Sequence, residues 1–99
     1  MHKFDVFEID RAFYAVVQAE HLLAINTIVV VPIRQVDLFP ALSRLTVDVE
    51  ISGVVWRVLC HMPLTLDARL LRNRMPVHRL PANEGQKVMD GLNAVLWGL

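Results

Sequence analysis

The clearest pattern in the sequence is a strict alternation of apolar and polar residues from Leu45 to Ile51. The apolar members are Leu45, Val47, Val49 and Ile51, and the polar members are Thr46, Asp48 and Glu50. A period of two places all the apolar side chains on one face of an extended strand. Ser52-Gly53 follows as a turn signal, and Val54 to Met62 returns as the partner strand. The pattern predicts a β-hairpin with one buried and one solvated face.

Several further segments also read as strands. Phe4 to Ile9 alternates, and Phe13 to Ala19 is rich in Val and aromatic residues, which suit a pleated, half-buried surface. Thr27 to Ile33 is β-branched without alternation, which predicts a central strand buried on both faces. Pro32 is expected to limit the pairing of that strand. After the hairpin we predict two short strands and then an irregular connection, over the ranges Leu64–Leu66, Ala68–Leu71 and Pro76–Pro81.

The periodicity changes near residue 83. Asn83 is the expected N-cap of a helix, and Gln86 three residues later completes a capping-box pattern. From there an apolar stripe recurs at helical spacing and is predicted to face the core. Its members are Val88, Leu92, Val95 and Leu99, widened by Met89 and Leu96. Strands followed by one helix predict a mostly β fold: an antiparallel sheet or small barrel with a C-terminal α-helix packed on it.

Composition places the chain in a broad class. Its 99 residues predict a single domain spanning residues 1–99. With 55% hydrophobic residues, so small a domain cannot bury all its apolar surface, so we expect a homodimer. The sequence opens without a signal-peptide pattern and contains no membrane-length apolar run. Cys60 is the single cysteine, in an apolar strand, and is expected to be a buried, inert thiol. We therefore expect a cytoplasmic protein that does not use a membrane.

Charge argues against a nucleic-acid-binding protein as the first interpretation. Ten Lys and Arg residues balance ten Asp and Glu residues, whereas proteins that bind phosphate backbones usually carry a basic surplus. A local basic group remains possible, and its members are Arg69, Arg72, Arg74 and Arg79. The simpler interpretation of these arginines is a solvated strand edge and loop.

Trp97 is the residue that departs most from the helical pattern. At about 100° per residue it lies roughly 140° from the centre of the apolar stripe, between Asp90 and Asn93. The largest apolar side chain is therefore predicted to point along the wet face in the last turn. It could pack on a loop or on a second copy of the chain. Alternatively it is an exposed anchor, because Trp is the residue type most enriched at interface hot spots.

The residues around Trp97 resemble the C-terminus of the CcdB toxins, the gyrase poisons of toxin–antitoxin pairs on plasmids and chromosomes. The similar segment is Asn93-Ala94-Val95-Leu96-Trp97-Gly98-Leu99. Weaker similarity extends from end to end, through Val17–Glu20, Asn26–Thr27, Val29–Ile33 and Trp56-Arg57. The resemblance implies an SH3-like barrel with a small added sheet and a C-terminal helix, assembled as a homodimer.

The resemblance also implies a function without catalysis, metal or cofactor. CcdB-like toxins bind the A subunit of DNA gyrase while it holds cleaved DNA, and they block resealing. A CcdA-like antitoxin neutralises the toxin, and the two together repress their operon. The toxin therefore contacts DNA only indirectly, through the antitoxin or gyrase. The implied gyrase contacts are Asn93, Leu96, Trp97, Gly98 and Leu99. A second contact, an aliphatic pair in the family, falls on His21 and Leu22, or on Leu22 and Leu23 if the match is shifted by one residue. His21 departs from the family's aliphatic pattern, and Leu96 replaces the Phe of the family's best-known member.

Two alternatives stay open at this stage. One is a dimeric relative without toxicity that retains only antitoxin binding and repression. The other is a ribonuclease toxin on the same barrel, which would need an acid, a base and positive charge around a phosphate. The four histidines are scattered along the sequence: His2, His21, His61 and His78. None is paired with a carboxylate at a spacing typical of a catalytic site. The sequence therefore favours a binding protein over an enzyme.

Overall fold

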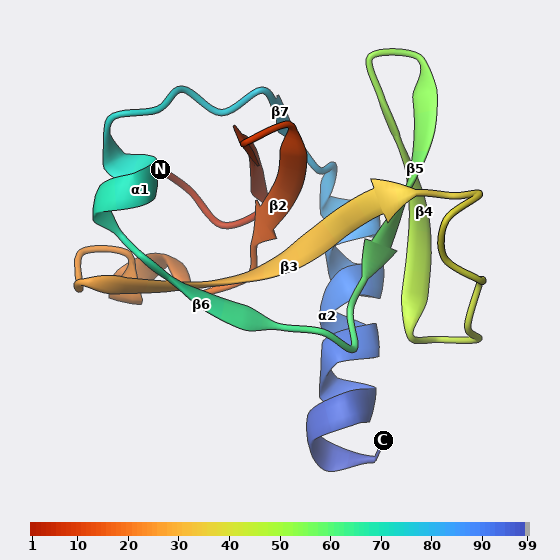
Figure 1. The fold of residues 1–99 in the computed structure, drawn as a ribbon. Coiled ribbons are helices and arrows are strands. Elements are labelled where there is room, and N and C mark those ends of the chain that lie inside the picture. Colours follow the sequence, from red (N-terminus) through yellow and green to blue (C-terminus); the bar gives the residue numbers. More distant parts are fainter. Residues whose placement is uncertain (99) are drawn as a thin grey trace.

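The computed structural model describes residues 1–98 as a curled antiparallel sheet with a long helix after it (Figure 1). In chain order the elements are β1 (Asp5–Ile9), β2 (Ala12–Val16), η1 (Glu20–Leu22), β3 (Thr27–Gln35), β4 (Thr46–Ile51), β5 (Val54–Leu59), β6 (Leu64–Asp67), α1 (Arg69–Arg72), β7 (His78–Arg79) and α2 (Ala82–Trp97). The expectation of a mostly β chain with a C-terminal helix is confirmed.

Strand β3 is the centre of the sheet. The strand order is β4-β5-β3-β2-β1-β7, and β6 also pairs with β3. One edge of β3 is shared: β6 pairs over Thr27–Val30 and β5 over Ile33–Gln35, while β2 takes the other edge. Pro32 lies in the gap between these two partners, so its missing N–H does not interrupt either ladder. The strand consequently runs on past the proline to Gln35, further than predicted.

Two-residue turns close both hairpins. Ser52 and Gly53 join β4 to β5 with φ values of 53° and 82°, and Asp10 and Arg11 join β1 to β2 with 50° and 66°. Positive φ at both central residues matches the right-handed twist of the flanking strands. The predicted hairpin is confirmed, with a register that pairs Val47 with Val58.

Side chains that alternate along the strands feed two separate cores. One core lies between the sheet and α2, and includes Val6, Val31, Val58, Val88 and Leu92. The other lies on the opposite face, beneath α1, and includes Phe7, Val16, Val30, Ala68 and Leu71. Neighbours in sequence on β1 and on β3 therefore enter different cores. This explains why the run from Thr27 to Ile33 lacks alternation, since both of its faces are covered.

Two glycines let α2 approach the rest of the chain. A Cβ at Gly85 would lie 2.5 Å from the Phe4 ring, and one at Gly91 would lie 2.5 Å from the Arg44 carbonyl oxygen. Neither space could hold a methyl group without a shift of its neighbours. The helix is therefore seated through its middle, where Val88 is fully buried.

The start and the last turn of α2 differ from the prediction. The helix begins at Ala82 with Pro81 as N-cap and no side-chain cap, so Asn83 lies inside the first turn. The Gln86 side chain donates instead to Asp90 at 2.9 Å. Val95, placed on the buried stripe by its spacing, is 41% exposed because the last turn extends beyond the sheet that α2 covers.

Shorter elements also differ. Residues 68–71 do not form a strand, because the Asp67 carboxylate accepts the N–H of Arg69 at 2.9 Å and the chain turns into α1. The second strand ends at Val16 rather than Ala19. The Val17 N–H still donates to the Val29 carbonyl, but the Val29 N–H donates to the Gln18 side-chain oxygen instead of a backbone carbonyl. The predicted irregular connection contains β7, which pairs with β1.

No helix among residues 1–98 is long and apolar enough to cross a membrane.

Candidate functional site

The end of α2 presents large apolar side chains to solvent. Trp97 is 72% exposed and Leu96 is 57% exposed, whereas Leu92 one turn earlier is buried. Figure 1 shows the reason: the last turn continues past the sheet. The expectation that helical spacing keeps Trp97 out of its own chain's core is confirmed. Three consecutive exposed apolar residues, Val95 to Trp97, form the helix-end patch.

Gly98 ends the helix beside this patch. It adopts a left-handed conformation with φ of 71°, and its N–H donates to the Ala94 carbonyl at 2.9 Å. A residue with a side chain adopts that conformation only at a cost in energy, so glycine is favoured at this position. Nothing lies within 4 Å of the position of its absent Cβ. The surface around Gly98 is therefore open in the described chain.

A groove lies between α2 and β4, and Asn93 belongs to it. Its volume is about 510 Å³, and its lining residues are Arg44, Thr46, Val47, Lys87, Asp90 and Asn93. On the helix, Asp90, Asn93 and Trp97 follow one another at spacings of three and four, which places them on one face. We call this hollow the α2–β4 groove. It extends the accessible face of α2 upstream from the helix-end patch.

Sequence reasoning missed most of this groove. The helical spacing of Asp90 and Trp97 was the one available signal for the α2 side. The β4 side depends on how the sheet curls under the helix, and on the loop between β3 and β4 that carries Arg44. Neither the curl of the sheet nor the path of this loop can be predicted from the pattern of neighbouring residues in the sequence.

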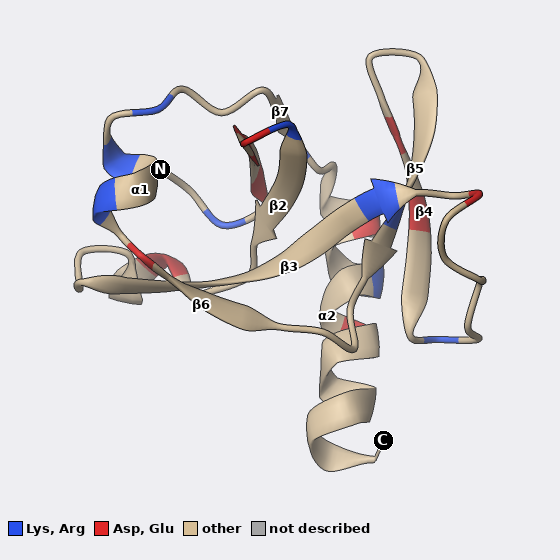
Figure 2. Cartoon of the chain, in the orientation of Figure 1, with Lys and Arg blue, Asp and Glu red and all other residues tan. Residues whose placement is uncertain are grey.

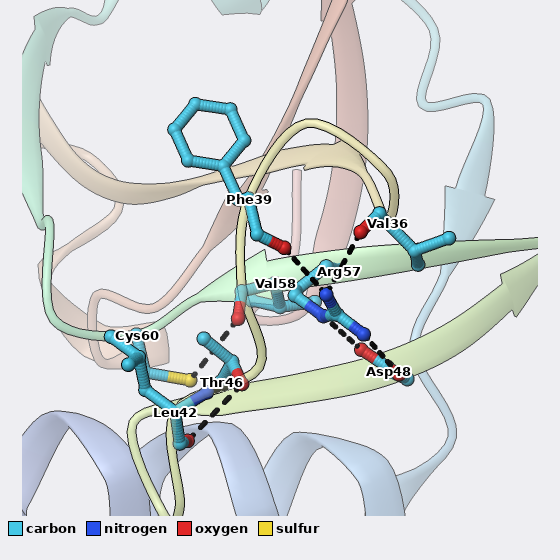
Figure 3. Close-up of polar contacts among 8 residues, drawn as sticks. All are labelled: Val36, Phe39, Leu42, Thr46, Asp48, Arg57, Val58 and Cys60. Carbon is cyan, nitrogen blue, oxygen red and sulfur yellow. Dashed lines mark hydrogen bonds and ion pairs between the residues drawn. The ribbon is translucent and has the colours of Figure 1, made fainter.

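Arg57 on β5 holds the loop that leads into β4 (Figure 3). Its guanidinium binds both carboxylate oxygens of Asp48, at 2.8 and 3.0 Å, across the hairpin. A third nitrogen, Nη1, donates to the Val36 carbonyl at 2.9 Å and to that of Phe39. The Arg57 side chain therefore holds the loop between β3 and β4 at two points, Val36 and Phe39.

The same pair is coupled electrostatically. The hydrogen bond from Arg57 holds the pKa of the Asp48 carboxyl below its ordinary value, and Asp48 raises the pKa of Arg57 in return. Both groups are therefore charged across the physiological range. This contact sits on the solvated face of the hairpin that the alternation predicts, but the sequence did not reveal its role in the loop.

Leu22, the second predicted contact, lies on η1 and is also exposed. The Gln18 side chain fixes this turn: its amide donates to the Leu22 carbonyl at 2.7 Å, and its oxygen accepts the Val29 N–H at 2.9 Å. His21 beside it is exposed as well. Figure 1 places this turn, in orange beside the start of β3, well away from the end of α2.

The predicted contacts therefore fall into two places within one chain. The structure brings Leu96, Trp97 and Gly98 together in the last turn of α2, with Asn93 one turn before them. Leu22 is separate from them, and Leu99 lies outside the described residues.

Catalytic groups are sparse in the described part of the chain. His2 Nδ1 lies 3.4 Å from a carboxylate oxygen of Glu20, a pair that the separation in sequence concealed, and both side chains are more than half exposed. Among residues 1–98 no set of three His, Cys, Asp or Glu side chains could hold a metal ion. Burial raises the pKa of the Cys60 thiol to about 11, which keeps it protonated and a poor nucleophile.

Comparisons with known proteins give both a sequence family and a set of structural neighbours. The family model described as CcdB protein matches residues 3–98. No curated protein sequence matches the chain. Similar solved structures include a MazE–MazF complex from Deinococcus radiodurans, with a TM-score of 0.79 and 17% identity over 97% of this chain and 95% of that chain.

Two mycobacterial structures are similar over the whole chain. An endoribonuclease in complex with its cognate antitoxin has a TM-score of 0.81 at 15% identity, covering 96% of that chain. A further structure of a mycobacterial endoribonuclease has a TM-score of 0.82 at 16% identity, covering 92% of that chain. At such low identity these matches show a shared barrel fold.

Proposed function

Because this chain belongs to the CcdB family, we propose that it is the toxin of a toxin–antitoxin pair and that it binds the A subunit of DNA gyrase. In this proposal the toxin engages gyrase that holds cleaved DNA and blocks resealing. The observation that carries the proposal is Trp97, which stands 72% exposed in the last turn of a helix that is firmly seated upstream. An anchor of this kind suits an interface hot spot.

The mechanism requires preferential binding rather than chemistry. A ligand shifts a conformational equilibrium only by the difference in its affinity for the two states. A rigid protein that fits gyrase better in the cleaved state than in the resealed state therefore accumulates the cleaved state. No acid, base or metal is needed for that effect.

Each part of the helix end has a role in this model. Trp97 is the main anchor, and Leu96 adds apolar contact area beside it. Gly98 leaves room for gyrase to approach, since nothing occupies the space around it. Asn93 supplies a side-chain amide at the mouth of the α2–β4 groove. Leu99 and Leu22 complete the proposed contact set.

Assembly and regulation follow the family pattern in the proposal. The protein acts as a homodimer, which presents the helix end twice. A CcdA-like antitoxin binds the dimer and displaces it from gyrase, and the complex represses the operon. The mycobacterial endoribonuclease in complex with its cognate antitoxin shares this fold, which supports an antitoxin partner.

Replacing Trp97 with alanine tests the proposal. We expect Trp97→Ala to weaken binding to purified gyrase A by at least about thirtyfold, the effect of losing roughly 2 kcal/mol at a hot spot. Its free energy of unfolding should change by less than about 0.5 kcal/mol, as for other exposed positions. Induction of the unaltered protein in bacteria should stop growth and trap gyrase–DNA cleavage complexes, and induction of the variant should do neither.

The matched control is Leu38→Ala. Leu38 is also a large exposed apolar residue, but it lies in the loop between β3 and β4. The Leu38→Ala variant should bind gyrase A as tightly as the unaltered protein does. Equal gyrase binding by the unaltered protein and Trp97→Ala would refute the proposed site, and a large drop in Tm for Trp97→Ala would show that the indole supports the fold.

A ribonuclease is the second candidate function, favoured by the fold shared with the endoribonucleases. Incubation of the purified protein with RNA distinguishes it, since cleavage would displace gyrase poisoning as the basis of toxicity. A folded protein that is harmless on induction and leaves RNA intact would instead be the relative that only binds antitoxin.

A further inference from the structure

A basic pocket lies away from the end of α2, between the N-terminal segment, α1 and the loop that leads to β7. Its volume is about 370 Å³. Phe7 and Leu71, each 1% exposed, form an apolar base. The polar and rim residues that define the pocket are His2, Asp5, Arg72, Arg74, Met75 and Arg79.

Two of its three guanidinium groups lack a carboxylate partner. Asp5, which is 2% exposed, binds Arg79 at 2.9 Å and is thereby neutralised. Within residues 1–98 no carboxylate oxygen lies within 4.0 Å of Arg72 or Arg74. The pocket's three arginines outnumber its one carboxylate, Asp5, so the pocket is positively charged although the chain as a whole is neutral.

The surroundings offset this charge only in part. Asp67, the acidic residue before α1, is bound by Arg69 at 2.7 Å, and it also interacts electrostatically with Arg72 without forming an ion pair. Figure 2 shows the basic positions of α1 and of the following loop gathered near the N-terminal end of the chain. The four arginines are exposed, as the simpler interpretation of a solvated edge and loop predicts, but Arg72 and Arg74 form no ion pair in the described chain.

Both guanidinium groups are held in place by backbone oxygens that carry no net charge. Arg72 donates only through Nη2, and Arg74 donates through Nε and Nη1. The acceptors are the carbonyls of Ala24, Ile25, Leu70 and Glu8. This leaves Nε and Nη1 of Arg72, and Nη2 of Arg74, without an acceptor in the described chain. Donors fixed in advance lose less entropy when they bind a ligand.

We propose that this pocket binds a phosphate group carried by a nucleotide or by the end of a nucleic-acid strand. The planar guanidinium fork matches phosphate oxygens with paired hydrogen bonds. The volume falls within the range of about 300–1,000 Å³ that is usual for small-molecule sites. Met75, at the rim above the buried Phe7 and Leu71, offers an apolar surface against which a sugar or base can pack. The site is separate from the helix-end patch and does not depend on gyrase binding.

The test uses Met75, which is 84% exposed and carries no side-chain hydrogen bond. Met75→Glu puts a negative charge at the rim without removing a contact that supports the fold, and Met75→Gln is the uncharged control of similar size. Leu38→Glu adds the same charge on a distant loop. Arg74→Gln removes one of the two free guanidinium charges and is used if it folds.

The probes separate the two sources of phosphate. Inorganic phosphate is titrated while amide NMR shifts are followed. Adenosine monophosphate and a 5′-phosphorylated single strand of about eight nucleotides are then compared by competition and fluorescence anisotropy, because single-strand sites span several nucleotides. We expect millimolar phosphate to shift the amides of residues 72–75, and Met75→Glu to weaken every phosphate probe by about tenfold at low salt, the size of one added like charge. Met75→Gln and Leu38→Glu should bind as the unaltered protein does.

The comparison among probes identifies the source. Tighter binding of the strand than of the mononucleotide, with affinity falling as salt rises, assigns the site to nucleic acid. Equal binding assigns it to a nucleotide. The proposal is overturned if phosphate leaves residues 72–75 unshifted, if Met75→Glu and Met75→Gln bind equally, or if a glutamate-rich peptide binds more tightly than every phosphate probe. Gyrase binding by Met75→Glu should be unchanged, so failure here leaves the function proposed for the helix end intact.

Discussion

At the scale of single residues, Arg57 joins three segments of the chain. It binds Asp48 on β4 and two carbonyl oxygens of the loop after β3. The alternation from Leu45 to Ile51 predicted that Asp48 faces solvent, and it does. It did not predict the arginine's loop contacts, because the carbonyls of Val36 and Phe39 come near β5 only once the sheet has formed. Trp97 was predictable for the opposite reason, since its exposure depends on spacing within one helix.

Acid should weaken the contribution of the Asp48–Arg57 pair. The pKa of Asp48 is lowered in the folded state, so its stabilising effect is present above the unfolded value of 3.8 and is lost as pH falls through the lower folded value. We expect Asp48→Asn to be less stable than the unaltered protein at pH 7, and the difference in unfolding free energy to shrink below about pH 3.8. Denaturant titrations at both pH values measure this, with Glu50→Gln as the control on the same strand face. A difference that stays constant with pH would show that the carboxylate's charge is not what matters.

At the scale of elements, the position of α2 follows from two glycines and a few buried side chains. The helical stripe predicted the burial of Val88 and Leu92 correctly, and it failed at Val95. Periodicity tells which face of a helix is apolar, but it cannot tell where the supporting sheet ends. The start of the helix failed for a related reason, because Asn83 matches a capping pattern while the chain already turns into the helix at Pro81.

Adding a side chain at Gly91 should push α2 away from the loop that carries Arg44. An alanine methyl there would meet the Arg44 carbonyl oxygen, which is backbone and cannot rotate away. Overpacking of this kind costs about 1–3 kcal/mol, and it outweighs the gain of up to about 1 kcal/mol in helix propensity. We expect Gly91→Ala to lower Tm, by about 4–8 °C for each kcal/mol lost in a domain of this size.

The matched control is Lys87→Ala, an exposed substitution one turn earlier on the same helix, which should leave Tm nearly unchanged. Thermal unfolding followed by circular dichroism measures both. An unchanged or raised Tm for Gly91→Ala would mean that the loop carrying Arg44 yields easily. In that case the glycine is not needed for the seat of the helix.

At the scale of the whole molecule, the sheet curls around one core and leaves a second core beneath α1. The sequence predicted the class of fold, because alternation, turns and a closing helix are local signals. It did not predict that β3 would be shared by β5 and β6, since such pairings join segments that are distant in the chain.

Apolar surface remains exposed on the single chain, as the composition predicted. Besides the helix-end patch, side chains such as Leu38 and Met75 are more than half exposed. We expect the protein to be a homodimer, with a light-scattering mass of twice 11.3 kDa at micromolar concentration. Its Tm should then rise with protein concentration, because association stabilises the folded state. A monomeric mass under these conditions, with a Tm independent of concentration, would contradict the dimer.

The overhang of α2 beyond the sheet separates two kinds of selection on one helix. Substitutions near Gly91 are constrained by folding, whereas those at the exposed Val95, Leu96 and Trp97 change the surface offered to other molecules at little cost to folding. The terminal turn can therefore be altered while the packing of the scaffold is kept. Exchanging that turn alone between relatives should transfer target choice while the scaffold stays the same.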